Sequence, residues 1–325
     1  MLAPLPKIRL GISACLLGQE VRYNGGHKRD AFLTDTLGRY VDWVDVCPEV
    51  EIGLGTPRPS MRLVRIGQGE AAEVRLVTPE TGVDHTEPMR SWAARRVEEL
   101  ARMELDGYVL KKDSPSCGME RVKLYPVDGG APNKEARGLF AEALLRRLPH
   151  LPVEEEGRLN DPPLRENFIS RVFAHARWRQ AEAEGWTRAA LMRFHEWHKL
   201  LLMARNQAGM RRLGRLLGES TRKDGPGELA RVYREGFTET MRRPPTRRGH
   251  TNMLQHMAGY VSDRLNPDDR QELRETIERY RLGLLPLIVP MTLLRHYVRK
   301  QEVEYLQGQA YLEPHPHELM LMNHV

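Results

Sequence analysis

The chain has 325 residues, 40% of them hydrophobic and 29% charged, which is the composition of an ordinary globular protein long enough for two domains. No apolar run approaches the roughly 18 residues that a membrane span needs, and the start, MLAPLPKIRL, lacks the apolar core and cleavage site of a signal peptide. Three cysteines are too few, and too odd a number, for a secreted disulfide framework. We therefore expect a cytoplasmic protein without membrane association, whose thiols are free.

Positive charge is concentrated in the second half of the chain. Residues 1–150 contain 22 Lys and Arg against 21 Asp and Glu, so five of the six net positive charges lie beyond them. Two interpretations stay open. The arginine-rich helices are solvated faces, or they meet an anionic partner such as RNA or a nucleotide phosphate.

The first half alternates strand and helix patterns. Strands are predicted at residues 8–12, 41–46, 74–77 and 108–110, and helices at residues 31–40, 91–104 and 138–148. This alternation predicts an α/β domain with a mostly parallel, Rossmann-like sheet. In such a sheet, ligands bind at the carboxyl ends of the strands.

The pattern changes near Pro149. The stretch LPHLPVEEEGRLNDPP is rich in proline and acids and is predicted to be a linker. Helices are then predicted at residues 164–184, 187–204, 209–217, 227–241, 252–265, 270–284 and 292–307. The sequence thus predicts an α/β domain over residues 1–157 and an all-α domain over residues 158–325.

Each of the three cysteines follows a predicted strand. Cys15 follows the strand at 8–12, Cys47 the strand at 41–46, and Cys117 lies in a Ser-Pro-Ser-Cys-Gly turn after the strand at 108–110. An isolated free cysteine is often just a small buried hydrophobic residue. Three at three strand ends favour a joint site.

The chemistry of that site follows from the number and spacing of the thiols. A structural zinc site needs a fourth Cys or His, usually in CxxC pairs, and the sequence has no CxxC. Three thiolates from separate loops suit a 4Fe-4S cluster that leaves one iron without a protein ligand. Such an iron acts as a Lewis acid toward a substrate atom.

Five ordered motifs then resemble a known family. They are SACLLG at 13–18, RYNG at 22–25, CPE at 47–49, GLGTPR at 53–58 and KKDSPSCG at 111–118. Over about residues 7–150 they are similar to the TudS-like thiouracil desulfidases. Residues 160–320 resemble a YbgA-like helical domain through GRLNDPPLRENFISRVF, FHEWHKLLLMARN and RRGHTNMLQHMAGY.

The resemblance implies a set of site residues and a reaction. The three cluster ligands of the family map onto Cys15, Cys47 and Cys117, its essential acid onto Glu49, and its essential serine onto Ser114. The implied reaction replaces the sulfur of a thiolated uracil by the oxygen of water, with the substrate sulfur on the free iron. On paper this chemistry needs no external redox cofactor.

Other residues are candidates for substrate binding. Ser13 and Ser116 could donate hydrogen bonds to cluster sulfurs or to the substrate, and Asn24 could bind a pyrimidine edge, although Asn-Gly is also good turn chemistry. Arg58, Arg62 and Lys112 could meet a nucleotide phosphate, although a solvated surface cation is the more ordinary explanation for each.

Three functions remain after the sequence alone. The leading one is a 4Fe-4S-dependent, non-redox desulfidase acting on thiouracil or a thiouridine nucleotide. The second is another cluster-dependent lyase or hydrolase on the same scaffold. The third is a nucleic-acid-binding adaptor whose basic helical half binds RNA and whose cysteines hold a structural metal. The sequence leaves the oligomeric state open.

Overall fold

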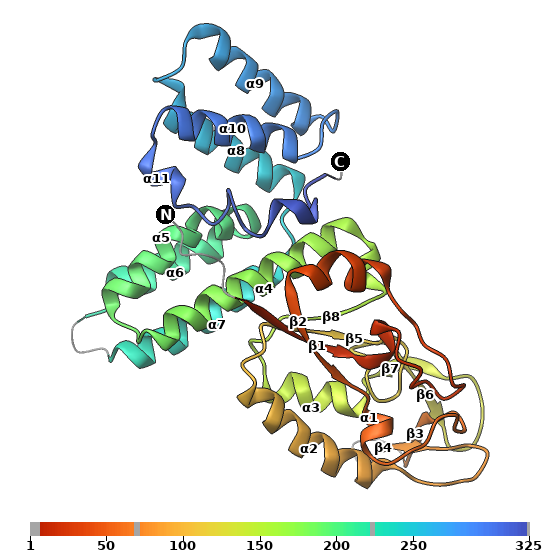
Figure 1. The fold of residues 1–325 in the computed structure, drawn as a ribbon. Helices are drawn as coiled ribbons and strands as arrows, with labels where there is room; N and C mark the ends of the chain where they lie inside the picture. The colour runs from red at the N-terminus through yellow and green to blue at the C-terminus, as the bar shows by residue number, and fades with distance from the viewer. Residues whose placement is uncertain (1–6, 68–71, 222–224, 324–325) are drawn as a thin grey trace. The chain divides into compact units, whose positions relative to one another are not determined.

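The computed structural model describes residues 7–67, 72–221 and 225–323. The chain divides into two compact units, one spanning Lys7–Asn160 and the other beginning at Asp161 (Figure 1). Among the described residues, no helix is long and apolar enough to cross a membrane.

A parallel sheet forms the centre of the first unit. Its strands are β2 (Val41–Val46), β1 (Ile8–Ser13), β5 (Gly107–Leu110) and β8 (Val153–Glu155), hydrogen-bonded in that order. All three strand pairs are parallel, so the four carboxyl ends meet at one edge. This confirms the predicted α/β class with a parallel sheet.

A second, mixed sheet lies in the same unit. It contains β4 (Glu73–Val77), β3 (Arg62–Ile66), β6 (Val122–Pro126) and β7 (Asn133–Ala136), in that order. Only the β3–β6 pair is parallel. Of these strands the sequence predicted β4 alone.

Two helices pack together in this unit, α2 (Thr86–Arg102) and α3 (Leu139–Arg147) (Figure 1). Phe140 of α3 is fully buried, and its ring centroid lies 5.3 Å from that of Trp92 and 5.8 Å from that of Tyr108 on β5. These aromatic contacts join the helices to the parallel sheet.

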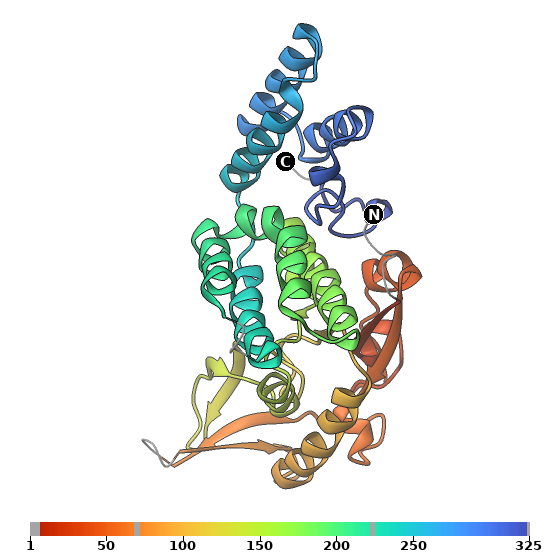
Figure 2. The ribbon, with the colours of Figure 1, turned by 90° about the vertical axis from the view of Figure 1, so that its left-hand side faces the viewer.

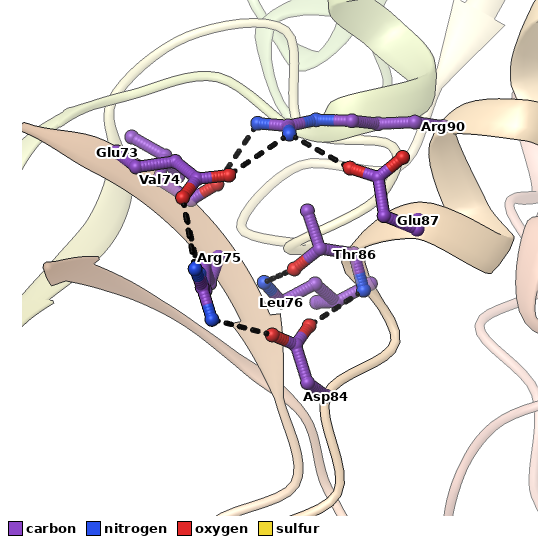
Figure 3. A network of polar contacts seen from close by, with 8 residues as sticks. All are labelled: Glu73, Val74, Arg75, Leu76, Asp84, Thr86, Glu87 and Arg90. Atoms are coloured by element: carbon purple, nitrogen blue, oxygen red, sulfur yellow. Dashed lines mark hydrogen bonds and ion pairs between the residues drawn. The ribbon is translucent and has the colours of Figure 1, made fainter.

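The start of α2 is fastened to β4 by the polar network in Figure 3. Arg90 donates to Glu73 at 3.2 Å and to the carbonyl of Val74 at 3.1 Å. The buried hydroxyl of Thr86 accepts from the backbone of Leu76 at 2.9 Å. Exposed ion pairs contribute little stability individually, so the buried Thr86 bond is the firmer attachment.

The helix predicted at residues 31–40 is irregular. The structure has a π-helical turn, η2 (Phe32–Thr36), followed by a 3-10 turn, η3 (Leu37–Arg39). Leu33 and Leu37 are fully buried there. Two further short helical segments follow strand ends at the site, η1 (Ala14–Leu17) and α1 (Pro48–Glu51).

The prediction of a linker at residues 148–163 is wrong in the middle of that stretch, because β8 lies within it. Its acids are buried and paired: Glu154 accepts from Arg158 Nε at 2.7 Å, and Glu155 accepts from the backbone of Met119 at 2.8 Å. Because this strand buries acids and lacks an alternation of apolar and polar residues, pattern analysis does not recognise it. The 3-10 turn η5 (Arg158–Asn160) ends the unit.

The second unit is mostly helical, as predicted. Its elements are α4 (Pro162–Ala183), α5 (Arg188–Arg205), α6 (Gln207–Glu219), α7 (Pro226–Arg242), α8 (Arg247–Ser262), α9 (Pro267–Arg281), α10 (Ile288–Lys300), α11 (Glu304–Gln307) and the 3-10 turn η6 (His317–Leu319). The helix predicted at 292–307 is two helices, separated where Glu302 has φ 49°.

Side-chain caps set where many of these helices begin. Asp161, Thr187, Asn206, Thr246 and Asn266 each accept a hydrogen bond from the third residue of the helix that follows. Helices α5, α6 and α7 pack together, and α8, α9 and α10 form a second group (Figure 2). Trp178 of α4 stacks on Tyr233 of α7, with centroids 5.8 Å apart.

Candidate functional site

The three cysteines line one cavity in the first unit. Cys15 lies two residues after the end of β1, Cys47 directly follows β2, and Cys117 lies in the turn that follows β5. Because these strands are neighbours and parallel, their following loops converge at one edge of the sheet. The cavity there has a volume of about 590 Å³, and all three cysteines are among its lining residues.

The turn that carries Cys117 is built by Ser114. The Ser114 hydroxyl accepts from the backbone of Cys117 at 3.0 Å and from that of Ser116 at 3.3 Å, and its carbonyl accepts from Gly118 at 2.8 Å. One serine therefore orders the whole turn and holds the Cys117 backbone in place. Both Ser114 and Cys117 line the cavity.

Gly138, at the start of α3, lies directly behind this turn. A Cβ placed on Gly138 would be 2.4 Å from the carbonyl carbon and oxygen of Ser116 and 2.8 Å from the nitrogen of Cys117. These are backbone atoms, so the turn or the helix would have to shift. The close approach of α3 thus depends on the absence of a side chain at this position.

Gly138→Ala is accordingly expected to destabilise the first unit by about 1–3 kcal/mol, the usual cost of overpacking, and to lower its iron content after reconstitution. Urea unfolding and iron analysis measure the two effects. Gly227→Ala is the control, because nothing lies within 4 Å of a Cβ at that helical glycine. An unchanged midpoint and iron content in Gly138→Ala would show that α3 does not hold the turn.

Glu49 is in contact with two of the cysteine loops. Its Oε2 lies 3.5 Å from Cys47 Sγ, and its Oε1 accepts a short hydrogen bond from the hydroxyl of Ser116. Arg58 Nη2 lies 3.9 Å from Oε2, and the two side chains are only 9% and 12% exposed. Ser116 is fully buried, so this carboxyl group is held from both sides.

Burial raises the pKa of all three thiols. The pKa of Cys15 rises to about 11 and that of Cys47 to about 12, in both cases chiefly by desolvation, with Glu49 adding to the effect. Desolvation also raises the pKa of Cys117, although hydrogen bonds from Ser13 and Ser116 oppose it. The thiols are therefore protonated at neutral pH in the absence of a metal, and metal binding releases those protons.

Cationic and acidic side chains share the rim. Lys111 Nζ forms a short ion pair with Glu156, which also accepts from the backbone of Lys112 at 2.8 Å. The Lys111 backbone donates to the hydroxyl of Ser13 at 3.0 Å. Sequence reasoning missed Glu156, because it lies in the segment predicted to be a linker, just past β8.

The other candidates divide between the cavity and the outside. Ser13, Arg58 and Lys112 line the cavity, and Ser116 is joined to it through Glu49. Asn24 is exposed, and its side chain accepts from the backbone of Gly26 at 3.3 Å, which is the turn role. Arg62 lies over the ring of Tyr125 on the second sheet. Neither is among the residues lining the cavity.

The chain matches two family models. The first, described as 2-thiouracil desulfurase, matches residues 10–156, and the second, described as a protein of unknown function, DUF1722, matches residues 199–316. The uncharacterized protein YbbK of Bacillus subtilis (strain 168) is 31% identical over 156 residues, which cover 46% of this chain and 97% of YbbK. The chain belongs to the 2-thiouracil desulfurase family. Its second half belongs to DUF1722.

Two further similarities accompany this membership. The uncharacterized protein YbgA of Escherichia coli (strain K12) is 30% identical over 151 residues, 46% of this chain and 89% of YbgA. A solved structure of the 4Fe-4S-dependent thiouracil desulfidase TudS is 35% identical, with 48% of this chain and 95% of that chain covered and a TM-score of 0.38. A score of this size does not by itself establish a shared fold.

Proposed function

We propose that the first unit is an iron–sulfur-dependent desulfidase that converts thiouracil or a thiouridine nucleotide, with water, into the corresponding uracil and sulfide. The observation that carries the proposal is the convergence of three thiols and Glu49 on one cavity. The 2-thiouracil desulfurase family of the first half supports the kind of substrate.

The proposed cofactor is a 4Fe-4S cluster held by Cys15, Cys47 and Cys117. Thiolates are the ligands that such clusters use, and three of them, on separate loops, surround the space. Within the described residues, no group of three or more His, Cys, Asp or Glu side chains forms a site for a single metal ion. When bound, the cluster would supply a Lewis-acidic iron for a soft sulfur atom.

The chain's own residues supply the proton chemistry. Glu49 accepts a proton from the water that attacks the carbon bearing sulfur. The new C–O bond forms, the C–S bond breaks, and the two protons of the water leave with the sulfide, so nothing is oxidised or reduced. Arg58 and Ser116 are positioning residues, because Arg58 lies beside Oε2 of Glu49 and Ser116 donates to Oε1.

Arg58 and Lys112, the two candidate phosphate contacts that line the cavity, differ in how they are already paired. Arg58 is engaged with Glu49, which makes it a weaker candidate for holding a nucleotide phosphate. Lys112 has a half-exposed side chain on the cavity wall, and among the residues that the structure describes its ammonium group pairs only with exposed Asp113, at 3.8 Å. Lys112 is therefore the proposed phosphate contact. Because the second half of the chain is basic, thiolated RNA belongs in the same substrate panel.

The test is an anaerobic assay of reconstituted protein with 2-thiouracil, 4-thiouracil, their nucleotides and thiolated RNA. Loss of the thione absorbance and release of one sulfide per uracil are expected without reductant, dinucleotide or S-adenosylmethionine. Turnover only with dithionite would contradict the non-redox reaction. With bound iron demonstrated, inactivity on every thiolated pyrimidine would favour another lyase or hydrolase on this scaffold.

A further inference from the structure

The helical unit has a second cavity, far along the chain from the cysteine loops. Its volume is about 190 Å³, and its polar lining residues are Glu166, Arg247, His250 and Tyr280, beside the apolar Pro163, Pro245 and Leu287. The polar residues come from three different helices, α4, α8 and α9. All of them belong to the second unit, and the proposed desulfidase reaction uses none of them.

Two of the three motifs of the helical half line this cavity, and the third acts on one of its lining residues. Glu166 lies in RENFISRVF, Arg247 begins RRGHTNMLQHMAGY, and Arg205 is the next-to-last residue of FHEWHKLLLMARN. Arg205 is buried and acts electrostatically on Glu166, so the motif FHEWHKLLLMARN affects a lining residue of the cavity. Segments distant in the sequence thus supply polar groups to one cavity.

Glu166 is a charged group in this wall. It is 5% exposed, and burial alone would raise its pKa, but Arg205 and His315 reverse the effect and leave the pKa below its ordinary value. One carboxylate oxygen, Oε1, accepts from the hydroxyl of Ser170 at 2.8 Å. Within the described residues the other oxygen, Oε2, accepts no hydrogen bond, which leaves an acceptor for a ligand.

Two donors in the wall also lack protein partners. Tyr280 is 5% exposed, and its hydroxyl makes no hydrogen bond to any residue that the structure describes. Arg247 is exposed, and its guanidinium, next to Gly283, has no hydrogen bond or ion pair to a residue in the described ranges. Buried polar groups are normally satisfied, so a nearly buried hydroxyl facing a cavity points to a ligand or water.

The combination of groups selects a ligand class. A carboxylate excludes a simple anion, and Arg205 already balances the charge of Glu166, so a cationic ligand is not required. His250 Nδ1 is hydrogen-bonded to the Tyr311 hydroxyl at 2.7 Å. The groups assigned to the ligand are the Glu166 carboxylate as acceptor and Arg247 and Tyr280 as donors. One acceptor and two donors match an imide, whose N–H lies between two carbonyl groups. The cavity is smaller than the roughly 300–1,000 Å³ of drug-sized ligand pockets, which suits a single ring rather than a nucleotide.

We propose that this cavity binds a small planar imide heterocycle. The imide N–H donates to Glu166, and the carbonyl groups accept from Arg247 and Tyr280. The occupant is uracil, the product of the first unit; this identification rests on the proposed function. The helical unit would then be a binding module for the free pyrimidine.

Calorimetric titration of uracil into the full chain tests the proposal. The variant with all three cysteines replaced by Ala removes any contribution of a cluster and is expected to bind one equivalent of uracil. Arg247→Gln and Tyr280→Phe should each weaken binding roughly tenfold, the scale for one hydrogen bond to a charged or buried partner. Arg248→Gln, a neighbouring exposed arginine outside the cavity, should bind as the parent does.

Ligand variants distinguish the remaining explanations. 3-Methyluracil lacks the imide N–H and should bind at least tenfold more weakly than uracil; equal binding would overturn the imide contact. Binding of glycine or inorganic phosphate that is lost in Arg247→Gln, with no binding of uracil, would overturn the ligand class. Uracil binding that disappears with the cysteines would assign it to the first cavity. Because the cysteine-free chain is used, a failed desulfidase assay leaves this test intact.

Discussion

Replacing Cys15, Cys47 or Cys117 by Ala is expected to abolish both the iron–sulfur cluster and desulfidase activity. Each cysteine comes from a different loop at the edge of the parallel sheet, so no nearby thiol can substitute for the lost one. Anaerobic iron and sulfide analysis and absorption near 400 nm, where such clusters absorb broadly, measure the loss.

In the same variants, the helical unit serves as the folding control. The helical unit has a separate core, so its helical circular dichroism should persist in each variant. Ser60→Ala is a matched substitution in the cavity lining that removes no thiol, and it should keep the full iron content. A Cys15→Ala protein that retained four irons would refute a cluster shared by the three loops.

Glu49→Gln is expected to lower turnover by roughly 100-fold or more while the cluster remains, which is the usual scale for a positioned general base. The amide keeps the shape of the side chain and its contact with Ser116, but it cannot accept the proton of the attacking water. Single-turnover assays on reconstituted protein with equal iron content give the comparison. Glu51→Gln is the control, because Glu51 lies on the same short helix and pairs with Arg96.

Two results would redirect the assignment of the base. Near-normal turnover of Glu49→Gln with an intact cluster would place the base elsewhere, and Ser114 would be tested next. Loss of the cluster itself would make Glu49 a structural residue. Ser116→Ala separates positioning from catalysis, because it removes one hydrogen bond to Glu49 and leaves the carboxylate in place.

Local patterns in the sequence were enough for the outline of both halves. Hydrophobic runs ending at Cys15 and Cys47 predicted β1 and β2, and helical periodicity with capping residues predicted the second unit. The sequence also predicted that the cysteines lie together, because parallel neighbouring strands bring their carboxyl ends to one edge. These features depend on residues close together in sequence, which is why pattern analysis reaches them.

Other parts of the site depend on pairings between distant segments. Strand β8 pairs with β5 across more than 40 residues and brings Glu156 to Lys111, although its own sequence resembles a linker. Ser116 meets Glu49 across 67 residues. Neither contact has a local signal, because buried acids and serines become recognisable only when their partners are known.

The sequence by itself determined the fold class, the three thiols and their placement after strands, since each of these follows from short-range periodicity. Only the tertiary structure decided which side chains hold Glu49, that a predicted linker completes the sheet, and that two motifs of the helical half line a second cavity. The physical reason is that hydrogen bonds and burial of polar groups are satisfied by partners far away in the chain, and the order of residues along the chain does not encode those partners locally.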